Sequence, residues 1–176
     1  MKRTIQSTLA VLVGTAACGL VADQASAAII EFNFPITASQ EVPPPTVLGD
    51  AVQPSGIGSV TYDTDTNEFS YIIGYVGLTG SLTSAHVHGP APIGAVAGVA
   101  FPISAGAGAS GLIIGTTTIS EAEEADLLAG LMYVNIHTAE NPAGEIRGQI
   151  VNVPEPGSLA LVGAGALCLI RRRRQA

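Results

Sequence analysis

The stretch GSVTYDTDTNEFSYIIGYVGLTG, residues 58–80, holds two alternating segments on either side of a polar turn. Apolar and polar side chains alternate over residues 57–62 and again over residues 69–76, which is the period of strands with one buried face. Asp, Thr and Asn residues in YDTDTNEF (62–69) favour a tight turn between the two segments. This stretch therefore predicts a β-hairpin.

Six further short segments between turn residues have the same β-type composition, rich in Val, Ile and Thr. They cover residues 29–37, 83–88, 96–103, 112–119, 132–137 and 145–151. One segment is helical in character, because Ser120 and Glu123 have the spacing of a capping box and precede the apolar Leu127, Leu128 and Leu131. The predicted fold class is all-β: a Greek-key-like β-sandwich of about eight strands, with one short helix that crosses between strands.

The N-terminal end of the chain has the order of a secretory signal peptide. Lys2 and Arg3 give a basic start, an apolar run follows over residues 9–21, and the small residues ASA (25–27) form a cleavage site for signal peptidase. The apolar run is shorter than a membrane-spanning helix. We therefore expect residues 1–27 to form a signal helix that signal peptidase removes, and the chain to be exported through the inner membrane.

The C-terminal end contains a second apolar segment. Residues 157–170 carry no charge, and four arginines follow at residues 171–174. A helix of this length covers roughly 21 Å, which is less than the roughly 30 Å hydrocarbon core of a bilayer. The arginines would hold its end on the cytoplasmic side. We expect residues 153–176 to be a tail with a hydrophobic helix that enters the membrane at least transiently.

The region between the two ends, residues 28–152, is expected to be one strongly acidic domain. Of the seven Lys and Arg residues six lie outside it, whereas 12 of the 14 Asp and Glu residues lie inside, so its net charge is near −11. This charge excludes nucleic acid as a partner, because phosphate binding needs Lys and Arg. It favours divalent cations or basic partners. Both cysteines, Cys18 and Cys168, lie outside, so the domain depends on its core without a disulfide.

The chain has three histidines, and two of them lie in SLTSAHVHGP (81–90). His86 and His88 are two residues apart, so they share one face of a strand, opposite the apolar face. In LMYVNIHT (131–138), His137 likewise lies opposite the apolar residues of its strand. If the two strands are neighbours, the three imidazoles converge at one end of the sandwich.

Two interpretations of the histidines remain open. Neutral imidazole is a ligand for Zn and Cu, and three histidines with an open position form a known metal arrangement. Alternatively, the imidazoles hydrogen-bond backbone carbonyls of the loops GPAPIG (89–94) and TAENPAGE (138–145), which directly follow His88 and His137.

Arg147 is the only basic residue of the acidic domain. It shares a strand face with Glu145, and a lone arginine among many carboxylates favours a structural ion pair. We therefore expect Arg147 and Glu145 to pair, with Glu140 or an acid of a neighbouring strand as alternative partners.

The C-terminal tail combines a short motif, an apolar segment and a terminal arginine cluster, in that order. The residues of the motif and cluster are Pro154, Glu155, Pro156, Arg171, Arg172, Arg173 and Arg174. This combination resembles the PEP-CTERM sorting signal of bacterial surface proteins. The resemblance implies processing by an exosortase-type sorting enzyme and delivery to the cell envelope or an extracellular matrix.

Three blocks follow one another along the acidic domain: ITASQEVPPP (36–45), LTSAHVHGPAPIG (82–94) and LLAGLMYVNIHTAENPAGEIRGQI (127–150). Together these blocks resemble the chordin-type (CHRD) domain. The family occurs in animal chordin, which binds secreted growth factors, and in exported bacterial proteins whose activity is unassigned. The resemblance implies a β-sandwich and an extracellular setting, and it implies no reaction.

The function we expect is that of an exported, surface-sorted protein with a non-catalytic binding or structural role toward extracellular polysaccharide or protein. A single-site Zn- or Cu-binding module through His86, His88 and His137 is the alternative. A more distant one is a redox enzyme, since a His-x-His strand with a later His and Arg is similar to copper–zinc superoxide dismutase. In that similarity Arg147 would guide an anion. The chain has no fourth or fifth histidine for a bridged two-metal site.

Overall fold

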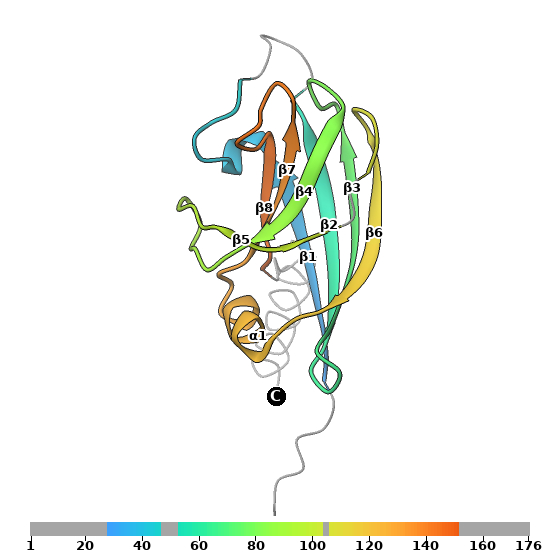
Figure 1. Cartoon of the computed structure of the whole chain (residues 1–176), viewed down its shortest axis with the longest axis vertical. Helices are drawn as coiled ribbons and strands as arrows, with labels where there is room; N and C mark the ends of the chain where they lie inside the picture. The colour runs from blue at the N-terminus through green and yellow to red at the C-terminus, as the bar shows by residue number, and fades with distance from the viewer. Residues whose placement is uncertain (1–27, 47–52, 104–105, 152–176) are drawn as a thin grey trace, which may run out of the picture.

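A computed structural model describes residues 28–46, 53–103 and 106–151 (Figure 1). Eight strands and one α-helix make up most of this part of the chain. The strands are β1 (Ile29–Thr37), β2 (Ser55–Asp63), β3 (Glu68–Val76), β4 (Leu82–His88), β5 (Val99–Pro102), β6 (Gly111–Thr118), β7 (Tyr133–Thr138) and β8 (Ile146–Gln149). The helices are α1 (Glu121–Leu128) and a short 3-10 helix, η1 (Ala38–Gln40). The predicted all-β class with one short helix is confirmed.

The eight strands form one antiparallel sheet in the order β5-β4-β7-β8-β1-β2-β3-β6. Two halves of four strands meet where β1 pairs with β8, and there the register contains a single pair, Thr37 with Arg147. The sheet curls so that the halves face each other, as the contact between Phe69 of β3 and Phe101 of β5 shows, with ring centroids 5.3 Å apart. The predicted sandwich is therefore a single sheet folded over its own core.

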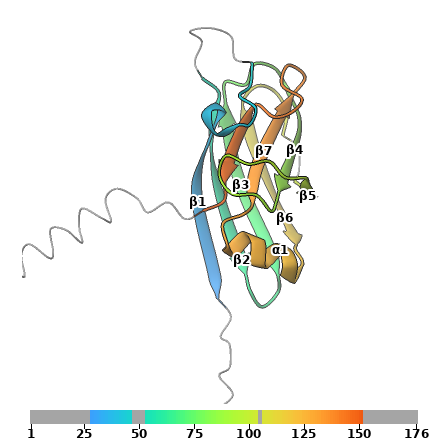
Figure 2. The same ribbon diagram turned by 90° about the vertical axis from the view of Figure 1, so that its left-hand side faces the viewer.

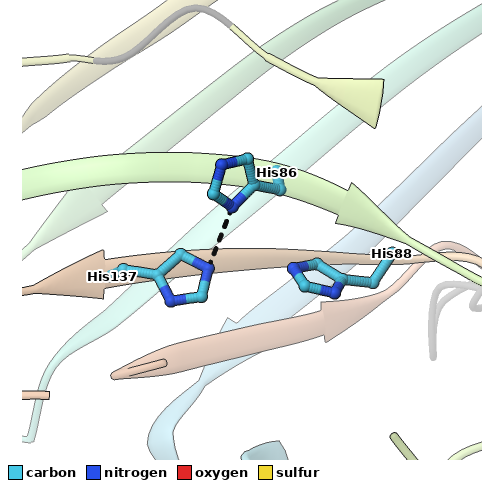
Figure 3. A group of neighbouring side chains, drawn as sticks. All are labelled: His86, His88 and His137. Atoms are coloured by element: carbon cyan, nitrogen blue, oxygen red, sulfur yellow. Dashed lines mark hydrogen bonds between the residues drawn. The ribbon is translucent and has the colours of Figure 1, made fainter. Parts of the chain in front are cut away.

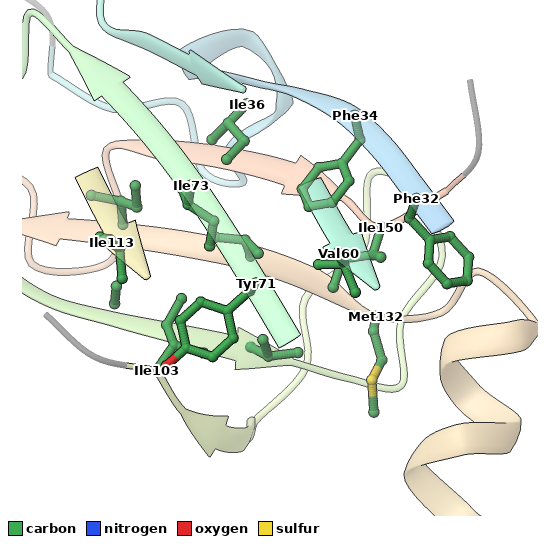
Figure 4. Close-up of a cluster of buried hydrophobic side chains, with 14 of the residues drawn as sticks. Phe32, Phe34, Ile36, Val60, Tyr71, Ile73, Ile103, Ile113, Met132 and Ile150 are labelled. Atoms are coloured by element: carbon green, nitrogen blue, oxygen red, sulfur yellow. The ribbon is translucent and has the colours of Figure 1, made fainter. Parts of the chain in front are cut away.

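The core lies between the two halves (Figure 4). Alternate residues of β1, β2, β3 and β6 point into it, among them Phe34, Val60, Ile73 and Ile113, all at most 2% exposed. Residues of the other half, such as Ile136, meet them from the opposite side. Among the described residues, every member of this cluster lies between positions 32 and 150, within the segment 28–152.

The predicted hairpin joins β2 to β3. Its register is continuous from Ser55 paired with Val76 to Asp63 paired with Glu68. Asp63 Oδ1 accepts hydrogen bonds from the backbone amides of two turn residues, and Asn67 adopts the positive φ of 57° that closes the turn. The acidic, Asn-containing turn thus sets the register that directs alternate side chains of both strands to the core.

Helix α1 connects β6 to β7, at opposite parts of the sheet. The Ser120 hydroxyl accepts from the Glu123 amide, and the Glu123 carboxylate accepts from the Ser120 amide, so the predicted capping box is formed. Leu127 is the helix residue that is fully buried. The helix covers the lower end of the sheet in Figures 1 and 2.

The predicted signal helix at residues 1–27 and the predicted hydrophobic helix at residues 157–170 lie outside the described residues. Among the residues that the structure describes, no helix is long and apolar enough to cross a membrane.

Candidate metal centre

Strands β4 and β7, which carry the three histidines, are neighbours in the sheet. In their antiparallel register His86 lies opposite Asn135 and His88 lies opposite Tyr133, while His137 is paired with Ser84. The core takes the alternate residues of both strands, so all three imidazoles lie on the face away from the core. The structure therefore fulfils the condition under which the sequence predicts that the imidazoles converge.

The three rings converge on the face of the β4–β7 pair that points away from the core, with His86 and His88 contributed by β4 and His137 by β7 (Figure 3). Ring centroids are 5.0 Å apart for His86 and His137, 5.7 Å for His86 and His88, and 5.9 Å for His88 and His137. One ring nitrogen from each histidine lies within 4.8 Å of the other two. Within the described parts of the chain, no carboxylate belongs to this group. The candidate ligand set is therefore purely imidazole.

Backbone carbonyls orient two of the rings. His88 Nδ1 lies 3.1 Å from Ala97 O, and His137 Nδ1 lies 3.1 Å from Pro142 O. A carbonyl only accepts hydrogen bonds, so both Nδ1 atoms carry the proton and both Nε2 atoms carry a lone pair. Metal-bound histidines characteristically donate their second ring N–H in this way.

The inward nitrogens of the group are closely spaced. His86 Nδ1 and His137 Nε2 are 3.2 Å apart, which suits either a hydrogen bond or two ligands of one ion. Two imidazole nitrogens on a tetrahedral zinc, each about 2.05 Å from the metal, are about 3.3 Å apart. His88 Nε2 is buried and has no hydrogen-bond partner among the described residues.

Burial keeps two of these imidazoles neutral. It lowers the pKa of His88 and of His137, and in both residues it outweighs the carbonyl hydrogen bond, which favours the protonated ring. The neighbouring histidines lower both pKa values further. His88 and His137 are thus neutral near pH 7, which is the state that coordinates a metal. His86 is the most exposed of the three and lies on the solvent side of the group.

Arg147, on β8, is buried beneath residues 89–98, a connection that we call the 89–98 loop. Its guanidinium donates to Ala95 O at 2.6 Å and also to Pro92 O and Gln149 Oε1. Its central carbon lies 3.5 Å from the centre of the Tyr133 ring, on which His88 also stacks. Figure 2 shows this loop passing over β7.

Glu145 has a separate set of partners, so the structure does not form the predicted pair with Arg147. Its carboxylate accepts hydrogen bonds from the Thr79 amide and hydroxyl, the Thr138 hydroxyl and the Asn141 side chain. These bonds lower the pKa of Glu145 although burial alone would raise it. Arg147 does not pair with Glu145 because its guanidinium instead donates hydrogen bonds to carbonyls of the 89–98 loop.

Two buried residues next to the histidines were missed by the sequence analysis. Glu41 is 4% exposed and Asn135 is 3% exposed, and they are joined by a hydrogen bond. Burial raises the pKa of Glu41, whereas the Val42 amide and the charge of Arg147 oppose that rise. Glu41 lies in ITASQEVPPP (36–45), far from the histidines in sequence, and only its position in a strand-ending turn could have marked it.

Residues 32–150 match the CHRD domain, which covers more than half of the chain and includes all three histidines. The chain belongs to the CHRD domain family. Residues 152–174 match the PEP-CTERM protein-sorting motif. Both resemblances seen in the sequence are thereby confirmed. No curated protein and no solved structure matches the chain significantly.

The two matches divide the chain between a sorted domain and its sorting signal. The CHRD domain contains the curled sheet and the histidine group, whereas the PEP-CTERM motif contains Pro154, Glu155, Pro156 and the arginines at 171–174. The motif is the signature of an exported protein that an exosortase-type enzyme processes. The sorting motif fits export of the chain to the cell envelope or exterior.

Proposed function

We propose that this CHRD protein is an exported binding module that holds one zinc or copper(II) ion through His86, His88 and His137. The observation that carries the proposal is the buried Nε2 atom of His88, which has no hydrogen-bond partner among the described residues. A buried acceptor without a partner costs about 1–3 kcal/mol. A metal ion placed between the three rings removes that cost, because it takes the lone pair.

The alternative interpretation, in which the histidines only form hydrogen bonds to loops, explains part of the observed geometry. It explains the Nδ1 atoms of His88 and His137, which face carbonyls. It provides no partner for the buried Nε2 atom of His88. A shared ion explains the carbonyl contacts as well, since they fix the rings with their lone pairs inward.

The proposed role in the envelope is binding, without a reaction. The sorting motif supports delivery by an exosortase-type enzyme after signal peptidase has acted, with membrane contact of the tail at least during sorting. Extracellular protein or polysaccharide is the proposed environment of the domain, and nucleic acid is not among its partners. A dismutase-like reaction would need the bridged site for which three histidines are too few.

The test is metal binding by the segment 28–152, which contains every core residue that the structure describes. The segment is stripped with a chelator, and binding of Zn²⁺ and Cu²⁺ is measured by calorimetry and elemental analysis at about 150 mM salt with excess Ca²⁺. We expect one tightly bound ion per chain. Replacement His88→Ala should weaken binding by at least about 100-fold, the upper end of the loss seen when a supporting residue is removed.

The matched control is Ser84→Ala, which lies on β4 two residues from His86 and offers no ring nitrogen. It should bind the ion as the unchanged segment does. The variants His86→Ala and His137→Ala should both lose the ion while keeping the circular dichroism spectrum of a folded sheet. Absence of stoichiometric binding, or equal binding by His88→Ala, contradicts the proposal and leaves the loop-bonding interpretation.

A further inference from the structure

The outer face of β2, β3 and β6 exposes an apolar surface. Five large side chains on this face are more than half exposed to solvent. They are Ile57 of β2, Ile72 and Val76 of β3, and Leu112 and Ile114 of β6. The strand register places them side by side, since Ile57 lies across Gly74 from Leu112, and Ile72 is paired with Ile114. We call these five residues the apolar face.

The apolar face contains a hollow as well as protruding side chains. A hollow of about 320 Å³ is lined by residues of β2, β3 and β6, among them Gly74, where an added Cβ would contact only the Leu112 side chain. Ile57 and Val76 form part of its wall. A second hollow, of about 240 Å³, lies beyond the row formed by Ile72 and Ile114. Ridge and hollow therefore lie side by side on one surface.

The chemistry of the face excludes several occupants. It carries no charged side chain, and the acids of the same strands, Asp63 and Glu68, lie at the far end of the hairpin. Among the described residues, none of the exposed large hydrophobic side chains is aromatic, so the face offers no ring on which a sugar stacks. The acidic domain also repels an anionic lipid surface.

We propose that the apolar face binds the same face of a second copy of this chain. A surface with a protruding ridge next to a hollow is complementary to itself after a two-fold rotation, as a symmetric dimer requires. The five side chains expose on the order of 500 Å² of apolar surface, the size of the largest patch on many monomeric proteins. Two copies together bury about 1,000 Å², which is the lower limit for a specific interface.

The dimer brings two acidic domains together, and the repulsion between them determines how its affinity depends on salt. The charge-free face is where two copies approach with the least repulsion, and salt screens the rest within a distance of about 8–10 Å. Association should therefore be weak, in the range of about 10 μM to 1 mM, and stronger at physiological salt than at low salt. The histidines lie on β4 and β7, which are not part of the apolar face, so metal is not required.

The test is sedimentation equilibrium of the segment 28–152 in the presence of a chelator, over that concentration range. We expect the mass to rise toward that of a dimer. Ile57→Lys should weaken association by at least tenfold, because it places two positive charges in the buried interface. Ile93→Lys is the matched control, because Ile93 is exposed to the same extent as Ile57, 71%, and lies on the 89–98 loop. It should leave association unchanged.

A second measurement uses the absence of cysteine from residues 28–152. Ile72→Cys should form a disulfide-linked dimer under mild oxidation, whereas Ile93→Cys should not. A segment that stays monomeric at every concentration overturns the proposal and leaves the apolar face to another occupant, such as residues 157–170 of the tail or a lipid. Equal loss of association in Ile57→Lys and Ile93→Lys also overturns it.

Discussion

His88 has a different task at each of its two ring nitrogens. Nδ1 donates to Ala97 O, and this bond together with the stacked Tyr133 ring fixes the plane of the imidazole. Nε2 then points into the histidine group, buried and without a partner among the described residues. Burial lowers the pKa of this ring, so protonation does not resolve the missing partner near pH 7.

Arg147 holds the 89–98 loop against the sheet. We expect Arg147→Ala to lower the stability of the segment 28–152 by about 3 kcal/mol, because two loop carbonyls and Gln149 lose their donor in a buried position. The melting temperature should fall by several degrees or more. Circular dichroism melts of the metal-free segment measure this effect.

Arg147→Lys separates charge from geometry. Lysine keeps the positive charge but lacks the planar fork that reaches Pro92 O, Ala95 O and Gln149 together. We expect most of the loss to remain in this variant. A melting curve equal to that of the unchanged segment in either variant would mean that the loop is held by other contacts.

The alternation of single residues could be predicted from the sequence, whereas their partners could not. The spacing of His86 and His88 correctly placed both on the face away from the core, because side chains in a strand alternate. The spacing of Arg147 and Glu145 suggested a pair in the same way. It failed because the 89–98 loop folds back over β7 and β8, and no local pattern in the sequence encodes that contact.

The start of helix α1 was correctly predicted from the sequence, because the capping box at Ser120 and Glu123 is formed. We expect Ser120→Ala to destabilise the segment 28–152 by about 1 kcal/mol, since the variant loses the hydroxyl that accepts from the Glu123 amide and keeps only the backbone bond to the Glu123 carboxylate. Urea denaturation measures the difference. Thr118→Ala, at an exposed end position of β6 just before the helix, is the control and should change stability far less.

The number of strands was predicted correctly, but several of their ends differ. β1 has the predicted bounds, because alternation and flanking turn residues coincide there. β5 is four residues long instead of eight, since its first predicted residues belong to the 89–98 loop that covers the polar face. Apolar composition alone does not distinguish a strand from a loop that packs on one.

The whole domain carries far more negative than positive charge, and folding brings these charges together. We therefore expect the melting temperature of the segment 28–152 to rise by several degrees between about 10 mM and 200 mM NaCl, as salt screens their repulsion. The measurement is made with a chelator present. Sucrose at equal osmolality is the control, and a melting temperature that does not depend on salt would contradict the expectation.

For the whole molecule the sequence predicted a sandwich, but it could not predict that all eight strands belong to one continuous sheet. Composition and turn spacing indicate how many strands exist, but the pairing of β1 with β8 joins segments about a hundred residues apart. The same holds for the histidine group, which needs β4 and β7 to be neighbours. Long-range pairing of this kind follows from how the core closes, and no short stretch determines it.

The carbonyls of Ala97 and Pro142 belong to two separate loops between strands. Each of them orients one imidazole by a hydrogen bond that does not depend on a bound cation. The imidazoles of such a site lose little rotational freedom when an ion binds, and the angles between their ring nitrogens do not change to suit the ion. Discrimination among metals then follows from the fixed coordination geometry of the histidine nitrogens more than from the general order of metal affinities. The two loops would thus set the selectivity of the protein without touching the ion themselves.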